Sequence, residues 1–160
     1  MTSEGARHPV SRRERVYYFE DVVVGEPLET PARTLTEADV GRYLGLTGEW
    51  DPRTTDEVSA RDSEAGGRVI PDFLPLCVSS GLGWRVPPPP LVVLAFMGFE
   101  WQFRLPLRIG DTIRSRSQTV AKRSLKDGGV VVEQREILNQ RDEVVQSGRL
   151  TLLVAKRPVP

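Results

Sequence analysis

The second half of the chain constrains the fold most, because it offers several long strands and only one apolar helix to cover them. The predicted strands are 91–105, 112–122, 130–138 and 144–155. In the first of these, Phe99, Trp101 and Phe103 alternate strictly, as in a strand with one buried face. Gly110–Asp111 and Asp127–Gly129 supply turns. Long antiparallel strands of this kind must bury one face of their sheet.

The only large apolar element available to cover this sheet is the segment 72–84. Its apolar residues are too continuous for an exposed amphipathic helix, so we expect a helix that is buried on most sides. Asp72 is placed to cap this helix, and Pro75 then falls in the first turn, where proline costs little. A long antiparallel sheet wrapped around one long central helix is the hot-dog architecture. We therefore predict an α+β chain with the hot-dog fold.

The first half is expected to contain shorter elements. Residues 27–34 are predicted as one strand that begins with a proline. The Pro87–Pro90 run at the junction of the two halves is expected to form a stiff polyproline II segment. Helix boundaries are predicted at Thr36 as an N-cap, at Gly45 and Gly48 as the end of that helix, and at Thr55 or Asp56 as the cap of a second, short helix.

Length and charge limit the class of protein. The chain has 160 residues, which fits one domain, placed at 16–160 behind a mobile tail at 1–15. Lys and Arg together number 22, as do Asp and Glu, so neither nucleic acid nor a membrane surface is expected as a partner. The longest apolar run, 91–97, is far shorter than the ~20 residues that span a bilayer. Because the N-terminus also lacks an apolar signal core, a cytoplasmic protein is expected.

The chain has one cysteine and one histidine, which restricts its chemistry further. Cys77 has no partner for an internal disulfide and is expected to be an inert core residue. His8 lies in the predicted tail, although histidine is the commonest general base near neutral pH. A histidine-based zinc site and a Ser–His–Asp triad are therefore not expected, and no metal or cofactor is predicted. A mechanism that needs histidine must take it from the tail or from another chain.

Four short motifs occur along the chain. They are Tyr18–Gly25 with Thr34–Asp39, similar to YFEDxxVG…RTVTEAD; Leu46–Pro52, similar to LTGDxNPxHxD; Gly67–Val69 with Leu74–Leu82, similar to GRIAHGMLxxSLxSGL; and Phe103–Asp111, similar to F…PVxxGD. Together they resemble the MaoC-like dehydratase and (R)-specific enoyl-CoA hydratase family, in the same order and spacing. The resemblance implies the hot-dog fold and a substrate carried as a CoA or acyl-carrier-protein thioester.

The second motif departs from the family at its catalytic pair. In the family, an Asp and a His five residues apart activate water for addition across an enoyl thioester. In this chain Glu49, a longer carboxylate, stands at the Asp position. Thr54 stands at the His position, where it cannot act as a base at neutral pH, and Asp51 replaces the Asn between them.

The third motif departs from the family at the start of the predicted helix, where Pro71–Phe73 replaces HGM. In the family, the N–H group of this Gly helps to polarise the thioester carbonyl. Asp72 keeps an N–H group but adds a carboxylate, which would repel a developing oxyanion if it is ionised. Ser80 and Gly81 match the SG pair of the family.

These comparisons define the candidate site. The predicted catalytic residues are Glu49, Asp51 and Asp72, and the predicted substrate-binding residues are Thr54, Phe73, Ser80 and Gly81. Each has a structural alternative. Glu49 is also consistent with a loop carboxylate, Asp51 with a turn residue, Asp72 with the helix N-cap and Ser80 with a small packing residue. Thr54 is expected to cap or to line the pocket and not to catalyse.

The predicted function is an acyl-thioester lyase of the hydratase or dehydratase type, with a histidine-free carboxylate site and an unusual biosynthetic substrate. The alternatives are a non-catalytic subunit of a heterodimeric hydratase, a thioester-binding module, or a thioesterase. The loss of His fits the first of these alternatives. The expected partners are acyl-CoA or acyl-carrier protein. A homodimer, or a heterodimer with another hot-dog chain, is expected because a hot-dog monomer exposes a long edge strand.

Overall fold

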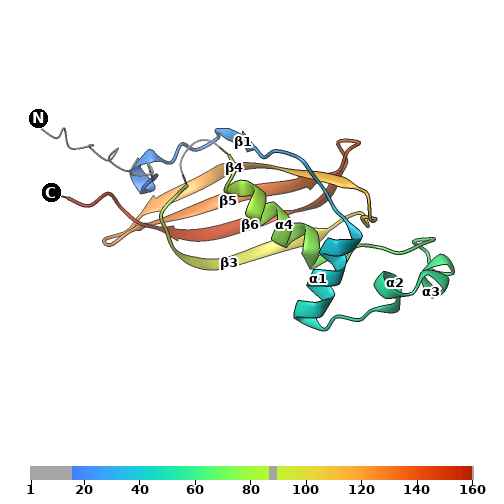
Figure 1. Cartoon of the computed structure of the whole chain (residues 1–160). Helices are drawn as coiled ribbons and strands as arrows, with labels where there is room; N and C mark the ends of the chain where they lie inside the picture. The colour runs from blue at the N-terminus through green and yellow to red at the C-terminus, as the bar shows by residue number, and fades with distance from the viewer. Residues whose placement is uncertain (1–15, 87–89, 160) are drawn as a thin grey trace, which may run out of the picture.

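The four long strands of the second half form the body of one antiparallel sheet (Figure 1). The structure, a computed structural model, describes residues 16–86 and 90–159. The long strands are β3 (Val93–Phe103), β4 (Thr112–Ser124), β5 (Gly129–Leu138) and β6 (Val144–Val154). They lie in the order β4-β5-β6-β3, so that β3 is an edge strand. The four strands predicted from the sequence are confirmed.

The strand predicted over 27–34 is wrong as a single element. It is divided into β1 (Pro27–Glu29) and β2 (Arg33–Thr34), both paired with β4. Pro31 lies in the break between them and has no N–H group to donate to a neighbouring strand. Strand pairing with β4 therefore stops after the pair Glu29–Arg116. It resumes at the pair Arg33–Ile113, with the register shifted by one residue.

The helix α4 (Phe73–Gly83) lies across the inner face of the sheet (Figure 1). Its buried apolar side chains pack in one cluster with Ile113 of β4 and Ile137 of β5. The hydroxyl groups of Ser79 and Ser115 form a hydrogen bond of 2.5 Å beneath the helix. The helix α1 (Glu37–Thr47) joins the same cluster through its buried side chains Val40 and Leu44. The predicted hot-dog arrangement of sheet and helix is confirmed.

The expectation that α4 is buried on most sides is wrong. Within the described residues, the sheet and α1 cover only part of its surface, and one side stays open. Cys77, expected in the core, is exposed, and Trp84 at the C-terminal end has 74% of its surface accessible. Phe73 and Ser80 are exposed as well. The apolar residues of α4 therefore lie both in the core and on a surface that nothing in the described residues covers.

The helix boundaries follow from local capping. Thr36 caps α1 by accepting a hydrogen bond from the Asp39 N–H group, and Gly48 ends the helix with φ of 71°. After α2 (Pro52–Thr55), Asp56 caps α3 (Glu57–Arg61) through the N–H groups of its second and third residues. These predicted caps are confirmed, whereas Gly45 lies inside α1. Capping by Asp72 is wrong: its backbone is already helical and its side chain makes no capping hydrogen bond.

Some expectations fall outside the described residues. The tail 1–15 with His8, and the first three residues of the Pro87–Pro90 run, are among them. No helix in the described part of the chain combines the length and the apolar composition needed to cross a membrane.

Candidate functional site

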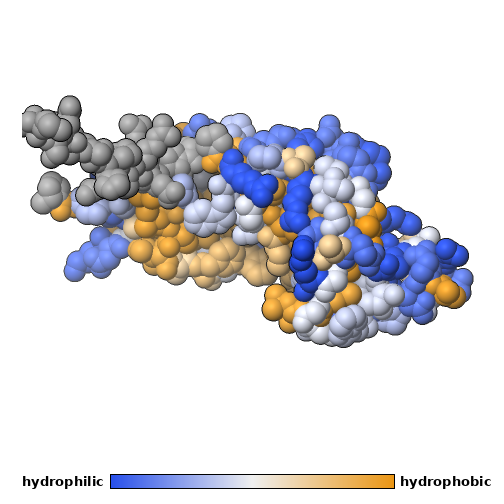
Figure 2. All heavy atoms as spheres, viewed as in Figure 1, coloured by the Kyte–Doolittle hydropathy of each residue, from blue (hydrophilic) through white to orange (hydrophobic). Residues whose placement is uncertain are grey.

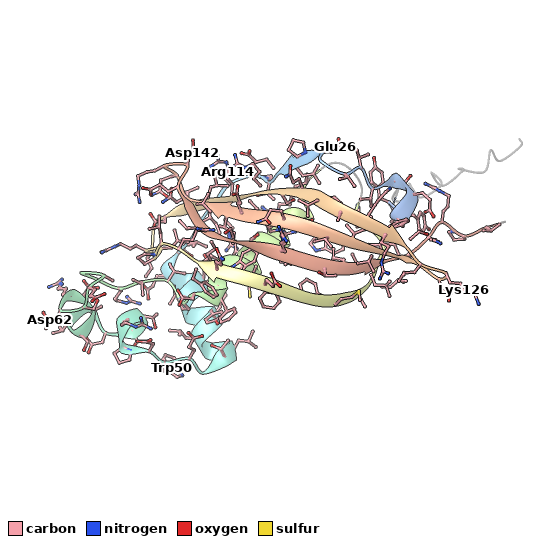
Figure 3. All side chains as sticks on the ribbon, turned by 180° about the vertical axis from the view of Figure 1, so that it is seen from behind. Glu26, Trp50, Asp62, Arg114, Lys126 and Asp142 are labelled. Carbon is pink, nitrogen blue, oxygen red and sulfur yellow. The ribbon has the colours of Figure 1, made fainter. Side chains whose placement is uncertain are left out.

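A pocket of about 560 Å³ lies at the N-terminal end of α4. We call it the acid pocket, because four of its lining residues are Glu49, Asp51, Glu64 and Asp72. Its other lining residues are Arg53, Thr54, Ser63, Ala65, Val69, Ile70, Pro71 and Pro106. The α1–α2 connection, marked by Trp50 in Figure 3, supplies one wall, and the start of α4 supplies another. The fold thus brings all three predicted catalytic residues, and Thr54, into one pocket.

The last turn of α1 holds Glu49 at its backbone and at its side chain. The Tyr43 hydroxyl group donates a hydrogen bond of 2.8 Å to Oε2 of Glu49. The Glu49 N–H group donates to Oγ1 of Thr47 at 3.3 Å, and that hydroxyl group donates to the Tyr43 carbonyl oxygen at 2.8 Å. Burial and the bond to Glu49 raise the pKa of Tyr43 to about 12. The phenol is therefore a protonated donor at neutral pH.

Asp51 is engaged by the residue two positions further along the chain. Its carboxylate accepts from the Arg53 N–H group at 2.8 Å and from the Arg53 guanidinium at 3.0 and 2.7 Å. These side-chain and backbone hydrogen bonds lower the pKa of Asp51, against a smaller opposing effect of burial. Asp51 also caps α2. Its oxygens are thus occupied by local structure, and Asp51 stays ionised at neutral pH.

Thr54, at the position of the family's histidine, is buried, with 4% of its surface accessible. Its hydroxyl group donates to the Asp51 carbonyl oxygen at 2.8 Å. Its own carbonyl oxygen accepts from Nε of Arg68 at 2.7 Å. The Arg68 guanidinium also donates two hydrogen bonds, of 2.8 and 3.0 Å, to the carboxylate of Glu37 at the start of α1. This chain of contacts fixes the connection against α1 and leaves no base at position 54.

Asp72 differs from Glu49 and Asp51 because no hydrogen bond to its carboxylate comes from residues 16–86 or 90–159. Its carbonyl oxygen accepts from Nε2 of Gln146 at 2.8 Å, and Oε1 of Gln146 accepts from Nε1 of Trp101 at 3.0 Å. The first turn of α4 is thereby tied to β6 and β3. The N–H groups of Asp72 and Phe73 donate to no acceptor in the described residues. A helix N-terminus with free N–H groups favours a negative or partly negative ligand atom.

The other predicted substrate-binding residues do not line the acid pocket. The Phe73 ring packs edge-on against Phe103, with the ring centroids 5.4 Å apart. Gly81 lines a second pocket of about 460 Å³ between α1 and α4. Ser80 is exposed on α4, and its neighbour Ser79 is the serine that packs against the sheet.

Two residues that the sequence analysis missed organise the site. Tyr43 holds Glu49, and Arg53 holds Asp51. Arg53 directly follows the Asp-Pro step, so a local ion pair to Asp51 is visible in the sequence. Tyr43 carries no such signal, because its contact requires the chain to reverse direction after α1. In the described part of the chain, no group of three His, Cys, Asp or Glu residues is placed to hold a metal ion.

Comparison with known proteins identifies the family. A family model described as "MaoC like domain" matches residues 20–140. The chain belongs to the MaoC-like domain family. Protein MaoC of Klebsiella aerogenes is 36% identical over 117 residues, which make up 72% of this chain and 33% of that protein. The MaoC-like chain thus spans about one third of the length of the curated relative that it matches.

Solved structures confirm the fold of this MaoC-like chain. A monoamine oxidase regulatory protein from Archaeoglobus fulgidus is 31% identical, with a TM-score of 0.85 over 91% of this chain and 99% of that one. A MaoC-like dehydratase from Rhodospirillum rubrum is 26% identical, with a TM-score of 0.78 over 89% and 99%. A Mycobacterium tuberculosis protein with a double hot-dog fold is 18% identical, with a TM-score of 0.77 over 89% of this chain and 45% of that one. The last likeness shows the fold alone.

Proposed function

We propose that this MaoC-like chain is an acyl-thioester lyase of the hydratase or dehydratase type, in which Glu49 replaces the Asp–His pair. The observation that carries the proposal is the convergence of Glu49, Asp51, Thr54 and Asp72 on one pocket at the N-terminus of α4. The thioester carrier is CoA or acyl-carrier protein, and no cofactor is needed. The description of the Rhodospirillum rubrum protein as a dehydratase supports this reaction class.

The reaction needs only one carboxylate. Glu49 takes a proton from the carbon next to the thioester carbonyl of a β-hydroxyacyl group, and the electron pair forms the double bond. The β-hydroxyl group leaves with the proton that Glu49 has just accepted, so that an enoyl thioester and water are released and Glu49 is ionised again. The free N–H groups of Asp72 and Phe73 donate to the thioester oxygen while it carries negative charge.

The remaining acids have different roles in this proposal. Asp51 is ionised and bound to Arg53, so it shapes the connection between α1 and α2. Asp72 lines the same pocket and contributes its backbone N–H group. Thr54, Phe73, Ser80 and Gly81 are retained as candidate contacts of the acyl group and its carrier.

The test replaces one carboxylate at a time. Glu49→Gln keeps the shape of the side chain and is expected to lower kcat on β-hydroxyacyl and enoyl thioesters by about 100-fold or more, because a proton transfer catalyst is lost. Glu64→Gln is the matched control, since Glu64 lines the same pocket without a hydrogen bond to Tyr43. Full activity of Glu49→Gln across a panel of CoA and acyl-carrier-protein thioesters would remove Glu49 from the mechanism.

We also propose that the active unit is a dimer formed along β3. This edge strand exposes Leu94, Phe96, Met97 and Phe99, and about half of each side chain is accessible. A long apolar edge strand favours pairing with a second chain. The open side of α4 lies next to this edge, so a second chain would cover both surfaces.

A second candidate function is a non-catalytic subunit of a heterodimeric hydratase. The observation in its favour is Thr54, whose hydroxyl group is used by the Asp51 carbonyl oxygen and offers no base. Co-purification from the native source decides between the two. A second hot-dog chain with an intact Asp…His pair in the complex would support this role, whereas a stable and active homodimer would exclude it.

A further inference from the structure

We propose that Tyr43 is a positioning residue, which holds Glu49 by one carboxylate oxygen and leaves Oε1 to carry the proton in the reaction. This inference rests on the proposed function of Glu49. It adds a residue that belongs to α1, outside the acid pocket, and it assigns different tasks to the two oxygens of Glu49.

The first support is the way in which the Tyr43 hydroxyl group is placed. The Tyr43 ring is partly buried and packs against the cluster that contains Leu44, Leu74 and Val78. The ring is therefore fixed by the core, whereas its hydroxyl group emerges toward the α1–α2 connection and donates to Oε2 of Glu49 at 2.8 Å. Because the ring cannot move freely, its hydroxyl group can hold the flexible Glu49 side chain in one orientation.

The second support is that Tyr43 is attached to Glu49 along two routes. The Glu49 N–H group reaches the Tyr43 carbonyl oxygen through the Thr47 hydroxyl group, by bonds of 3.3 and 2.8 Å. The hydroxyl group of Tyr43 then reaches the other end of the same residue. Glu49 is six positions after Tyr43, and Gly48 in the left-handed conformation lets the chain turn back between them. The turn and the hydrogen bond thus define the Glu49 side chain together.

The third support is the chemistry of the two oxygens. The other acids of the pocket have no such phenol: Asp51 is held by Arg53, and the carboxylates of Glu64 and Asp72 have no hydrogen-bond partner in the described residues. Glutamate has one more rotatable bond than the aspartate that the family uses at this position. An added bond must be fixed if the carboxylate is to meet the same reacting atom. Oε2 is the atom that Tyr43 binds, so Oε1 is the atom left to exchange a proton with the substrate.

The phenol is not itself the proton donor in this scheme. Its pKa of about 12 keeps the proton on Tyr43 throughout the neutral range. Tyr43 therefore acts through Glu49 and touches no reacting atom.

The test separates positioning from folding. Tyr43→Phe removes only the hydroxyl group and keeps the ring in the core, so the thermal midpoint should change little. We expect kcat to fall by about 10- to 100-fold with KM nearly unchanged, because a misplaced catalytic group slows the reaction without weakening binding. Tyr17→Phe is the matched control, because it removes a hydroxyl group at a distant pocket. Equal kcat in Tyr43→Phe and the wild-type chain would overturn the inference.

A titration tests the pair without any substrate. The chain has three tyrosines, so Tyr17→Phe with Tyr18→Phe leaves Tyr43 as the only phenol. Its ultraviolet titration should lie near pH 12 and move to lower pH when Glu49→Gln is added. An unchanged titration would overturn the inference, whatever the activity. A wild-type chain that turns over no thioester would instead overturn the proposed function, so the two failures are distinguishable.

Discussion

At the scale of single residues, the acids of this chain show that position in the fold, and not residue type, sets what a carboxylate does. Asp51 caps α2 and forms an ion pair with Arg53, and Glu49 accepts a hydrogen bond from a phenol. The Asp72 carboxylate has no hydrogen-bond partner in the described residues. Asp39 is the buried member of the set, with 7% of its surface accessible. It completes the capping box of α1 and pairs with Arg33.

Asp39 gives a prediction about stability and pH. Burial acts to raise its pKa, but hydrogen bonds from Thr36 and the charge of Arg33 outweigh it, so the pKa lies below the usual 3.8. A group with a lowered folded pKa stabilises the fold above its unfolded pKa, and this contribution is lost as pH falls through the folded pKa. Asp39→Asn should therefore cost about 1–3 kcal/mol at pH 7.

Urea unfolding at several pH values checks this prediction. The gap in unfolding free energy between the wild-type chain and Asp39→Asn should narrow as the pH falls below 3.8. Asp62→Asn serves as the control, because Asp62 is exposed and its carboxylate has no hydrogen bond in the described residues; its effect should stay within about 0.5 kcal/mol. A gap that is the same at pH 7 and at the lowest pH would contradict the account.

At the scale of elements, two strands and one helix are held together by close contacts that need small residues. Gly148 of β6 faces Trp101 of β3, and the backbone of β3 passes close to it. A Cβ atom at this position would overlap the carbonyl oxygen of Glu100 and the Trp101 ring. Trp101 in turn donates to Gln146, which holds the start of α4. The glycine thus contributes to the position of the acid pocket.

Gly148→Ala should destabilise the chain by about 1–3 kcal/mol, because the strand or the Trp101 ring must shift to admit a methyl group. Gly45→Ala is the opposite control: a Cβ atom there meets nothing within 4 Å, and alanine should stabilise α1 by about 0.5–1 kcal/mol. Chemical denaturation measures both. A Gly148→Ala chain as stable as the wild type would show that β3 and β6 are more loosely packed than the structure indicates.

At the scale of the whole molecule, exposed apolar side chains follow the β3 edge of the sheet. Figure 2 shows apolar residues along the face that contains α4 and the β3 edge. On β3 the exposed large side chains include Leu94, Phe96, Met97 and Phe99. Single exposed apolar residues are ordinary, but a contiguous set along an edge strand and the adjacent helix marks an interaction surface.

The dimer proposal predicts that charge on this edge separates the subunits. Leu94→Lys with Phe96→Lys should halve the mass measured by light scattering at a fixed concentration, because lysine on an edge strand opposes pairing. Val58→Lys is the control, since Val58 is 72% accessible but lies on α3, away from β3. If the double variant and the control have the same mass as the wild-type chain, the dimer does not form along β3.

Much of the fold was predictable because it depends on patterns local to the sequence. Alternation and turn residues predicted the four long strands, and Thr36, Gly48 and Asp56 predicted the helix boundaries, since each acts on its own neighbours. Two predictions of this local kind failed because of the backbone at a single residue. Capping by Asp72 failed because its backbone is already helical, and the single strand at 27–34 failed at Pro31.

The sequence by itself determined that this chain has a sheet, a covering helix and a set of acids in motifs that lack the family's histidine. Only the tertiary structure decided which of these acids is free to react. The contact between Tyr43 and Glu49 depends on how the chain turns after α1. The rotation of α4 about its axis decides that Ser79, and not Ser80, faces the sheet. Successive side chains on a helix point about 100° apart around the helix axis, and composition alone does not say which of them faces the sheet.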